Sequence, residues 1–131
     1  MPTPARLTAA RLPVELPPDA VVDVEGPLHF SDFGGSGPPM VLLHGIGGCR
    51  YNWLPAAWAL RASHRVFALD LLGFGRTPEG ARGVGFDAQQ RAVDGFLRRV
   101  ARAPAVLVGN SMGGLVALMQ AARAPDSVAR L

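Results

Sequence analysis

The sequence predicts an α/β fold in which an N-terminal antiparallel hairpin precedes parallel strands joined by crossover helices. Three short apolar runs, residues 40–43, 65–69 and 105–108, alternate with segments whose apolar residues recur at helical spacing. Uniformly apolar runs are typical of strands that are covered on both faces. Because parallel crossovers are right-handed and ligands bind at the carboxyl ends of such strands, that edge of the sheet is the expected site.

The hairpin is predicted from two short β-type segments, residues 21–25 and 28–33, which Gly26 and Pro27 separate. The preceding residues 1–20 are rich in proline and alanine and show little periodicity, so they are expected to form a poorly ordered extension. Residues 21–131 then make up one partial α/β domain.

Three helices are predicted between and after the strands. The first spans about residues 52–63, with Pro55 tolerated in its first turn. The second runs from Asp87 to about residue 101, because Asp87 and Gln90 resemble a capping box. The third follows residue 111 and ends near Ala124. Its residues expected to pack on the sheet are Leu115, Leu118 and Met119.

Composition narrows the class of protein. The chain has 131 residues, and its thirteen basic residues are all arginine and scattered along it, which argues against a nucleic-acid partner. Cys49 is the single cysteine, so no disulfide framework, metal-ligand cluster or cofactor is indicated, and a reduced, cytoplasmic setting fits. The sequence shows neither a signal peptide nor an apolar run long enough for a membrane span.

The motif GNSMG at residues 109–113 lies between the last predicted strand and the last predicted helix. A GxSxG in that setting indicates a nucleophile elbow, a strained turn that exposes the serine hydroxyl at the sheet edge. Gly109 and Gly113 are needed because a Cβ at either position would clash with neighbouring backbone. Ser111 would sit at a helix start, whose free N–H groups favour a developing oxyanion.

Two further motifs precede the elbow: VLLHG at residues 41–45 and LDLLGFGRT at residues 69–77. Together with VGNSMGG at residues 108–114, their order and spacing resemble three landmarks of the α/β-hydrolase superfamily, in its serine-nucleophile branch. The resemblance covers residues 21–131.

This resemblance implies roles for individual residues. Ser111 would be the nucleophile, and the backbone N–H groups of Ile46 and Met112 would form the oxyanion hole, where losing one donor typically costs ~3 to 4 kcal/mol. His44 would orient the oxyanion loop by hydrogen bonding, with Gly45 letting the backbone approach the reacting carbonyl. Asp70 would tie down its own glycine-rich loop.

A triad of Ser111, His44 and Asp70 is an alternative that the family order disfavours, since the acid and the base follow the serine in this family. No histidine follows Ser111, and His29 and His64 are expected at the surface. The resemblance thus implies a chain lacking its C-terminal half, with the strand before Ser111 left as an unpaired edge. Without a general base the chain alone is expected to be inactive or nearly so.

The leading hypothesis is a serine hydrolase that acts on a small ester or related carbonyl substrate through an acyl-enzyme. The elbow is also similar to those of carbon–carbon bond hydrolases of aromatic degradation, which is one alternative. A noncatalytic α/β-hydrolase-like fragment or binding protein is the other. Neither the substrate's identity nor the oligomeric state is indicated by the sequence.

Overall fold

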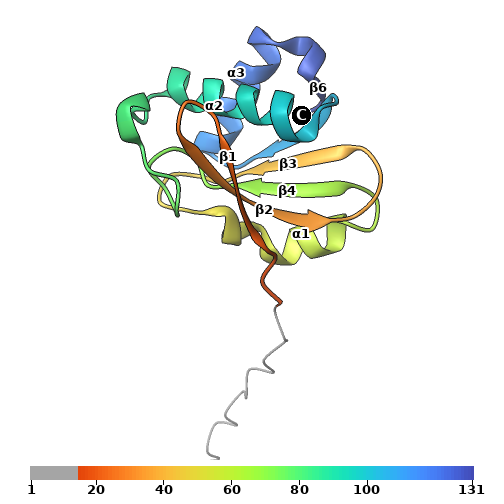
Figure 1. Ribbon diagram of the computed structural model, residues 1–131. Coiled ribbons are helices and arrows are strands. Elements are labelled where there is room, and N and C mark those ends of the chain that lie inside the picture. Colours follow the sequence, from red (N-terminus) through yellow and green to blue (C-terminus); the bar gives the residue numbers. More distant parts are fainter. Residues whose placement is uncertain (1–14) are drawn as a thin grey trace, which may run out of the picture.

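The computed structural model describes residues 15–131, which form a mixed six-stranded sheet with helices on both faces (Figure 1). The strand order is β1-β2-β4-β3-β5-β6. The predicted α/β class and the order of its elements are therefore confirmed. The strands are β1 (Asp19–Asp23), β2 (Pro27–Gly34), β3 (Pro39–Leu43), β4 (Arg65–Leu69), β5 (Ala105–Gly109) and β6 (Val128–Arg130). The helices are η1 (Arg50–Trp53), α1 (Leu54–Leu60), η2 (Gly80–Arg82), α2 (Phe86–Phe96), η3 (Leu97–Ala101), α3 (Met112–Arg123) and η4 (Pro125–Ser127).

The N-terminal hairpin is confirmed, because β1 pairs antiparallel with β2. β1 begins at Asp19 and ends at Asp23, so it starts two residues earlier than the predicted segment. Most of the predicted extension, residues 1–14, lies outside the described residues. The turn is closed by Glu25 in a left-handed conformation (φ 55°) and by Arg82, which donates to the Val24 and Gly26 carbonyls.

The order in which strands are added to the sheet reverses at β3, since β4 lies on one side of it and β5 on the other. β3 pairs in parallel with β4 on one side and with β5 on the other. The crossover from β3 to β4 carries α1, and the crossover to β5 carries α2. Such a reversal opens a crevice at the carboxyl ends of the strands, and it lies between residues 44 and 110 here.

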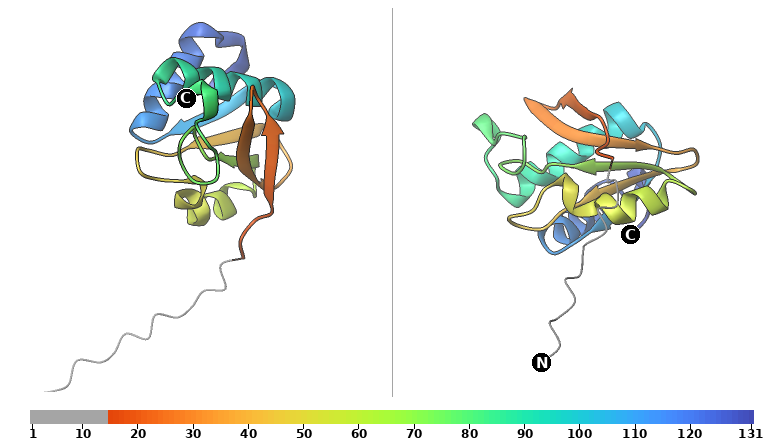
Figure 2. Two further views of the ribbon diagram at one scale, coloured as in Figure 1. Left: turned by 60° about the vertical axis from the view of Figure 1, so that its left-hand side comes forward. Right: turned by 90° about the horizontal axis from the view of Figure 1, so that it is seen from below.

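The two faces of the sheet bury separate apolar cores. Figure 2 shows the helices that cover the sheet from further directions. Val41 and Leu43 of β3 point to the face covered by α2 and α3, whereas Met40 and Leu42 point to the face covered by α1. This alternation follows from the two-residue period of a strand. It explains why β3 is apolar at every position.

The first two helices differ in part from their predictions. The segment predicted as one helix over 52–63 is a 3₁₀ turn followed by α1, which ends at Leu60. The predicted capping box of α2 is wrong, since the N-cap is Gly85 without a side-chain cap. Asp87 instead pairs with Arg123, and Gln90 bonds to Gln120, so both side chains are used to join α2 to α3.

The predicted packing of α3 is wrong for Leu115 and Leu118, whereas Met119 is half-buried. Leu115 and Leu118 are 42% and 58% exposed, whereas the buried positions are Met112, Gly113, Val116, Ala117 and Gln120. The close approach of Gly113 to β3 decides which side of the helix meets the sheet. The apolar leucines consequently face outward.

The strand that precedes Ser111 is not left wholly unpaired, contrary to the expectation. The short strand β6 pairs in parallel with β5 through Ala105 and Val106. Asp126 and Ser127 lie in the 3₁₀ turn that leads into β6. Only the second half of β5 lacks a partner on that side among the described residues.

Candidate active site

Ser111 occupies the junction between β5 and α3 in a strained backbone conformation. Its φ and ψ are 54° and −115°, and it is the N-cap of α3. Among residues 15–131 only two other non-glycine residues, Glu25 and Arg102, have positive φ. A strain of about 1–3 kcal/mol persists only where the surroundings hold it, and functional sites are where such strain concentrates.

The glycines on either side of Ser111 show what holds the turn. A Cβ on Gly109 would lie 2.4 Å from the carbonyl oxygen of Gly113. A Cβ on Gly113 would lie 2.2 Å from the Leu43 carbonyl oxygen and 2.6 Å from that of His44. The steric reason predicted for both glycines is thereby confirmed, and the turn is seen to rest on the end of β3.

The loop that follows β3 lies beside Ser111. A Cβ built on Gly45 would be 3.4 Å from the Ser111 Cβ. His44 is buried, and its Nδ1 lies 2.7 Å from the Gly45 carbonyl oxygen. Its Nε2 accepts a hydrogen bond of 3.0 Å from the Leu71 N–H, so the proton of the neutral ring belongs on Nδ1. His44 therefore fastens this loop to the end of β4.

The contact between the His44 Nδ1 and the Gly45 carbonyl also fixes the orientation of the Gly45–Ile46 peptide. The Gly45 carbonyl accepts from His44 and from the Gly48 N–H at 3.1 Å. Because the C=O and N–H of a trans peptide point in opposite directions, the Ile46 N–H points away from the His44 ring. Neither this N–H nor that of Met112 donates to a backbone carbonyl within residues 15–131.

Two hollows flank the turn that carries Ser111. The first has a volume of about 610 Å³ and lies between the ends of β3 and β5, where residues 44–48 meet Gly109 and Asn110. Asn52 and Trp53 complete its wall, and the sequence analysis did not predict either of them. The second, of about 680 Å³, reaches Ser111 and runs along the exposed side of α3 past Leu115 and Leu118.

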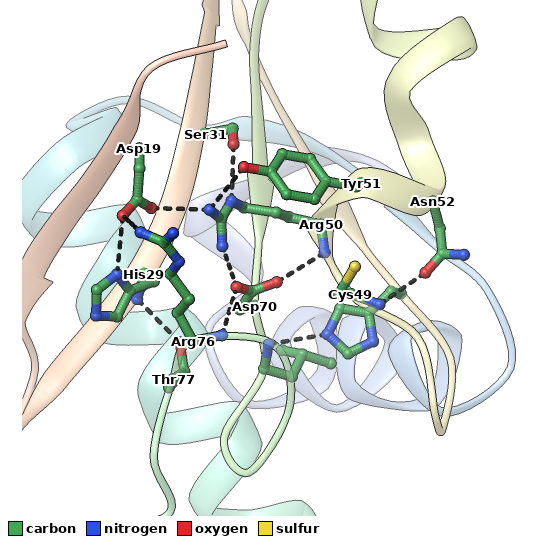
Figure 3. A network of polar contacts seen from close by, with 12 residues as sticks. Asp19, His29, Ser31, Cys49, Arg50, Tyr51, Asn52, Asp70, Arg76 and Thr77 are labelled. Carbon is green, nitrogen blue, oxygen red and sulfur yellow. Dashed lines mark hydrogen bonds and ion pairs between the residues drawn. The ribbon is translucent and has the colours of Figure 1, made fainter. Parts of the chain in front are cut away.

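Asp70 is buried and does not join Ser111. Its carboxylate accepts hydrogen bonds from the backbone N–H groups of Arg50 and Arg76, at 2.7 and 3.0 Å, and pairs with the Arg50 guanidinium (Figure 3). A Cβ on Gly75 would lie 2.2 Å from this carboxyl group. The expectation that Asp70 ties down its own loop agrees with these contacts, but its pairing with Arg50 was not foreseen.

The histidines cannot complete a triad with Ser111 in this arrangement. Both ring nitrogens of His44 are already occupied. His29 lies near Asp19, and His64 bonds to Ser63. Burial lowers the pKa of His44, and its contacts with the Gly45 carbonyl and Asp70 offset only part of that shift. His44 is thus held as a neutral, structural imidazole.

The described part of the chain shows no arrangement for a metal ion: no three His, Cys, Asp or Glu side chains of residues 15–131 lie close enough together to hold one. None of its helices is long and apolar enough to cross a membrane.

Comparison with known proteins identifies the family. The family model described as alpha/beta hydrolase fold matches residues 38–131. The chain belongs to the α/β-hydrolase family. In the crystal structure of E-2-(acetamidomethylene)succinate hydrolase, 41% of that chain superimposes on 85% of this α/β-hydrolase chain, with a TM-score of 0.80 and 29% identity.

Curated relatives of this α/β-hydrolase chain are considerably longer. It is 42% identical over 105 residues to the dihydrolipoyllysine-residue acetyltransferase component of an acetoin cleaving system from Pseudomonas putida, covering 79% of this chain and 28% of the relative. It is 34% identical over 109 residues to the sn-1-specific diacylglycerol lipase ABHD11 of Mus musculus, covering 80% of this chain and 35% of the relative. The chain therefore spans about a third of their length.

Proposed function

We propose that this chain provides the nucleophile and the oxyanion hole of a serine hydrolase that acts on an ester or related carbonyl compound. The observation that carries the proposal is the strained Ser111, which lies at the start of α3 beside the loop after β3. A serine held in this way exposes its hydroxyl at the sheet edge. The diacylglycerol lipase relative supports an ester as the substrate class.

In the proposed reaction the Ser111 Oγ attacks the carbonyl carbon and loses its proton to a general base. The carbonyl oxygen becomes an oxyanion, which the N–H groups of Ile46 and Met112 stabilise. The tetrahedral intermediate then expels the alcohol, which takes up the proton, and leaves an acyl-serine. Water then hydrolyses the acyl-serine ester, which releases the carboxylic acid and regenerates the Ser111 hydroxyl.

The hollow between β3 and β5 suits the carbonyl group of such a substrate. It is lined by Asn52, Trp53 and the glycine-rich backbone of residues 45–48, so it offers polar groups beside the turn that carries Ser111. The hollow along α3 extends to Leu107 and Val108 of β5, on the edge where β5 has no partner among the described residues, and we assign it no substrate group.

The general base is the part that residues 15–131 do not provide, since His44 has both nitrogens occupied. We therefore expect the isolated 131-residue chain to show little or no ester turnover. The carbon–carbon bond hydrolase stays an alternative prediction without a specific observation in its favour.

The test is covalent labelling of the natural gene product that carries these residues. A fluorophosphonate should add one adduct mass to the unmodified protein, and peptide mapping should place it on Ser111. The Ser111→Ala variant should not be labelled, whereas a Ser63→Ala variant, which alters an exposed serine, should react normally. Absence of any adduct in the unmodified protein would favour the noncatalytic alternative and sink the enzyme proposal.

A further inference from the structure

A buried ion pair joins the end of the loop after β3 to the end of β4. The side chains of Arg50 and Asp70 are 2% and 0% exposed, and the guanidinium pairs with the carboxylate (Figure 3). The Arg50 Nε donates to the Ser31 hydroxyl at 2.9 Å, and a terminal nitrogen lies 3.0 Å from Asp19. A second terminal contact reaches the Tyr51 hydroxyl at 3.0 Å. The guanidinium is thus surrounded by acceptors from four elements of the chain.

The carboxylates of Asp70 and Asp19 balance the positive charges of Arg50 and Arg76. Asp19 also pairs with Arg76 at 3.0 Å and lies 3.4 Å from the His29 Nδ1. Burial disfavours the charge on Arg50, but the attraction of Asp70 and Asp19 outweighs it, so its pKa is raised above the ordinary value. Arg50 remains a cation inside the protein.

Stability alone gives a weak reason for such a pair, because desolvation of two buried charges offsets most of their attraction. What a buried, fully bonded pair provides is a defined geometry. The relevant geometry is that of residues 45–49, which form the loop between His44 and Arg50. The Leu71 N–H holds His44 at one end of this loop, and Asp70 holds the Arg50 N–H at the other.

Both anchors therefore belong to adjacent residues at the end of β4. Between them, the hydrogen bonds that residues 15–131 show for the loop are local: the Gly48 N–H donates to the Gly45 carbonyl, and the Cys49 N–H donates to the Asn52 side chain at 2.6 Å. With both ends fixed to one rigid strand, the Gly45–Ile46 peptide is left with little freedom to turn.

We infer that Arg50 and Asp70 form a buried clamp that positions the Ile46 N–H for the oxyanion. This inference rests on the proposed hydrolase function. Arg50 is a positioning residue here, since it acts on the reaction only through the loop. Lysine could replace its charge but not its planar set of donors, which reaches Asp70, Asp19 and Ser31 together.

Arg82 offers a matched control. Its guanidinium also donates to several acceptors, the carbonyls of Val24, Gly26, Pro27 and Pro78, at 2.7–3.0 Å. It fastens the β1–β2 turn, and none of these hydrogen bonds reaches residues 45–49. Removing it should weaken the fold without moving the loop.

The experiment compares Arg50→Met, Arg50→Lys and Arg82→Met in the natural gene product, using p-nitrophenyl butyrate as substrate. Arg50→Met should lower kcat by roughly ten- to a hundredfold with KM within about threefold, because oxyanion contacts act mainly in the transition state. Arg50→Lys should recover part of that loss. Arg82→Met should keep kcat within about twofold even if its Tm falls. Equal kcat losses in the Arg50 and Arg82 variants would overturn the clamp.

Hydrogen exchange gives a readout that needs neither catalytic turnover nor the Arg50→Met variant. Amides in residues 48–52 should exchange at least about tenfold faster in Arg50→Lys than in the unmodified protein, while those of α2 stay unchanged. Unchanged exchange in this segment would contradict the clamp even if the protein proved to be no hydrolase. Conversely, faster exchange in a protein that no fluorophosphonate labels would support the clamp and reject the proposed function.

Discussion

Replacing Gly113 by alanine tests how tightly the Ser111 turn rests on β3. The new Cβ would lie 2.2 Å from the Leu43 carbonyl oxygen, where ordinary contacts are 3.4–4 Å. The nearest atoms, the carbonyl oxygens of Leu43 and His44, belong to the backbone at the end of β3, so no side-chain rotation relieves the overlap. The start of α3 must therefore retreat from β3 by roughly 1 Å.

The magnitude follows from what this retreat removes. The Asn110 N–H donates to the Leu43 carbonyl at 3.0 Å, and losing that bond costs about 1 kcal/mol. Overpacking adds about 1–3 kcal/mol. The better helix propensity of alanine returns up to about 1 kcal/mol. The net expectation is a loss of about 1 to 4 kcal/mol in the free energy of unfolding.

Urea unfolding followed by the fluorescence of Trp53 and Trp58 measures this loss. Gly114→Ala is the matched control, since its Cβ would lie 3.3 Å from the nearest atom, the Gly109 carbonyl oxygen. That variant should stay within about 1 kcal/mol of the unmodified protein. Equal unfolding midpoints for the two variants would refute the reasoning about the turn.

Two further predictions concern the core and the pH dependence of stability. Phe96 is fully buried, and the centroid of its ring lies 5.0 Å from that of Phe30 and 5.5 Å from that of Phe67. Phe96→Ala should therefore lower the free energy of unfolding in urea by about 3–5 kcal/mol, whereas Phe86→Ala, at a side chain that is 44% exposed, should lower it far less. Similar losses in the two variants would contradict the packing. His44 has a lowered pKa in the folded protein, so the unfolded chain binds the proton more tightly and stability should fall as pH drops below about 6.5, by up to about 1.4 kcal/mol per pH unit. His44→Gln should flatten this dependence in denaturation measured from pH 7 to 5, and an unchanged slope would show that His44 does not cause it.

Patterns that depend on local chemistry predicted much of the fold. The apolar run at residues 65–69 coincides with β4, and the GxSxG glycines predicted the strained turn at Ser111. The packing of α3 could not be predicted in this way, because Leu115 and Leu118 fit a helical apolar stripe as well as Val116 and Ala117 do. Only the contact between Gly113 and β3, which is tertiary, selects the buried side.

The residues of the candidate site divide in the same way, into those that a local pattern predicts and those that only a tertiary contact determines. Its motif residues could be named because each needs a particular backbone geometry, but Arg50 could not, since nothing in its local sequence marks a buried arginine. A signal did exist in Asp70: a carboxylate at the end of a buried strand requires a cationic or hydrogen-bonding partner. Sequence alone does not say which of thirteen arginines provides it.

The parallel pairing of β3 with β5 also bears on how the protein folds. It joins residues on either side of two complete crossovers, as in the register of Leu43 with Gly109. Contacts between such distant parts of a chain close large loops and form slowly. The neighbourhood of Ile46 and Met112 therefore does not exist until this pairing is made, and the candidate oxyanion hole should be among the last features to appear during refolding.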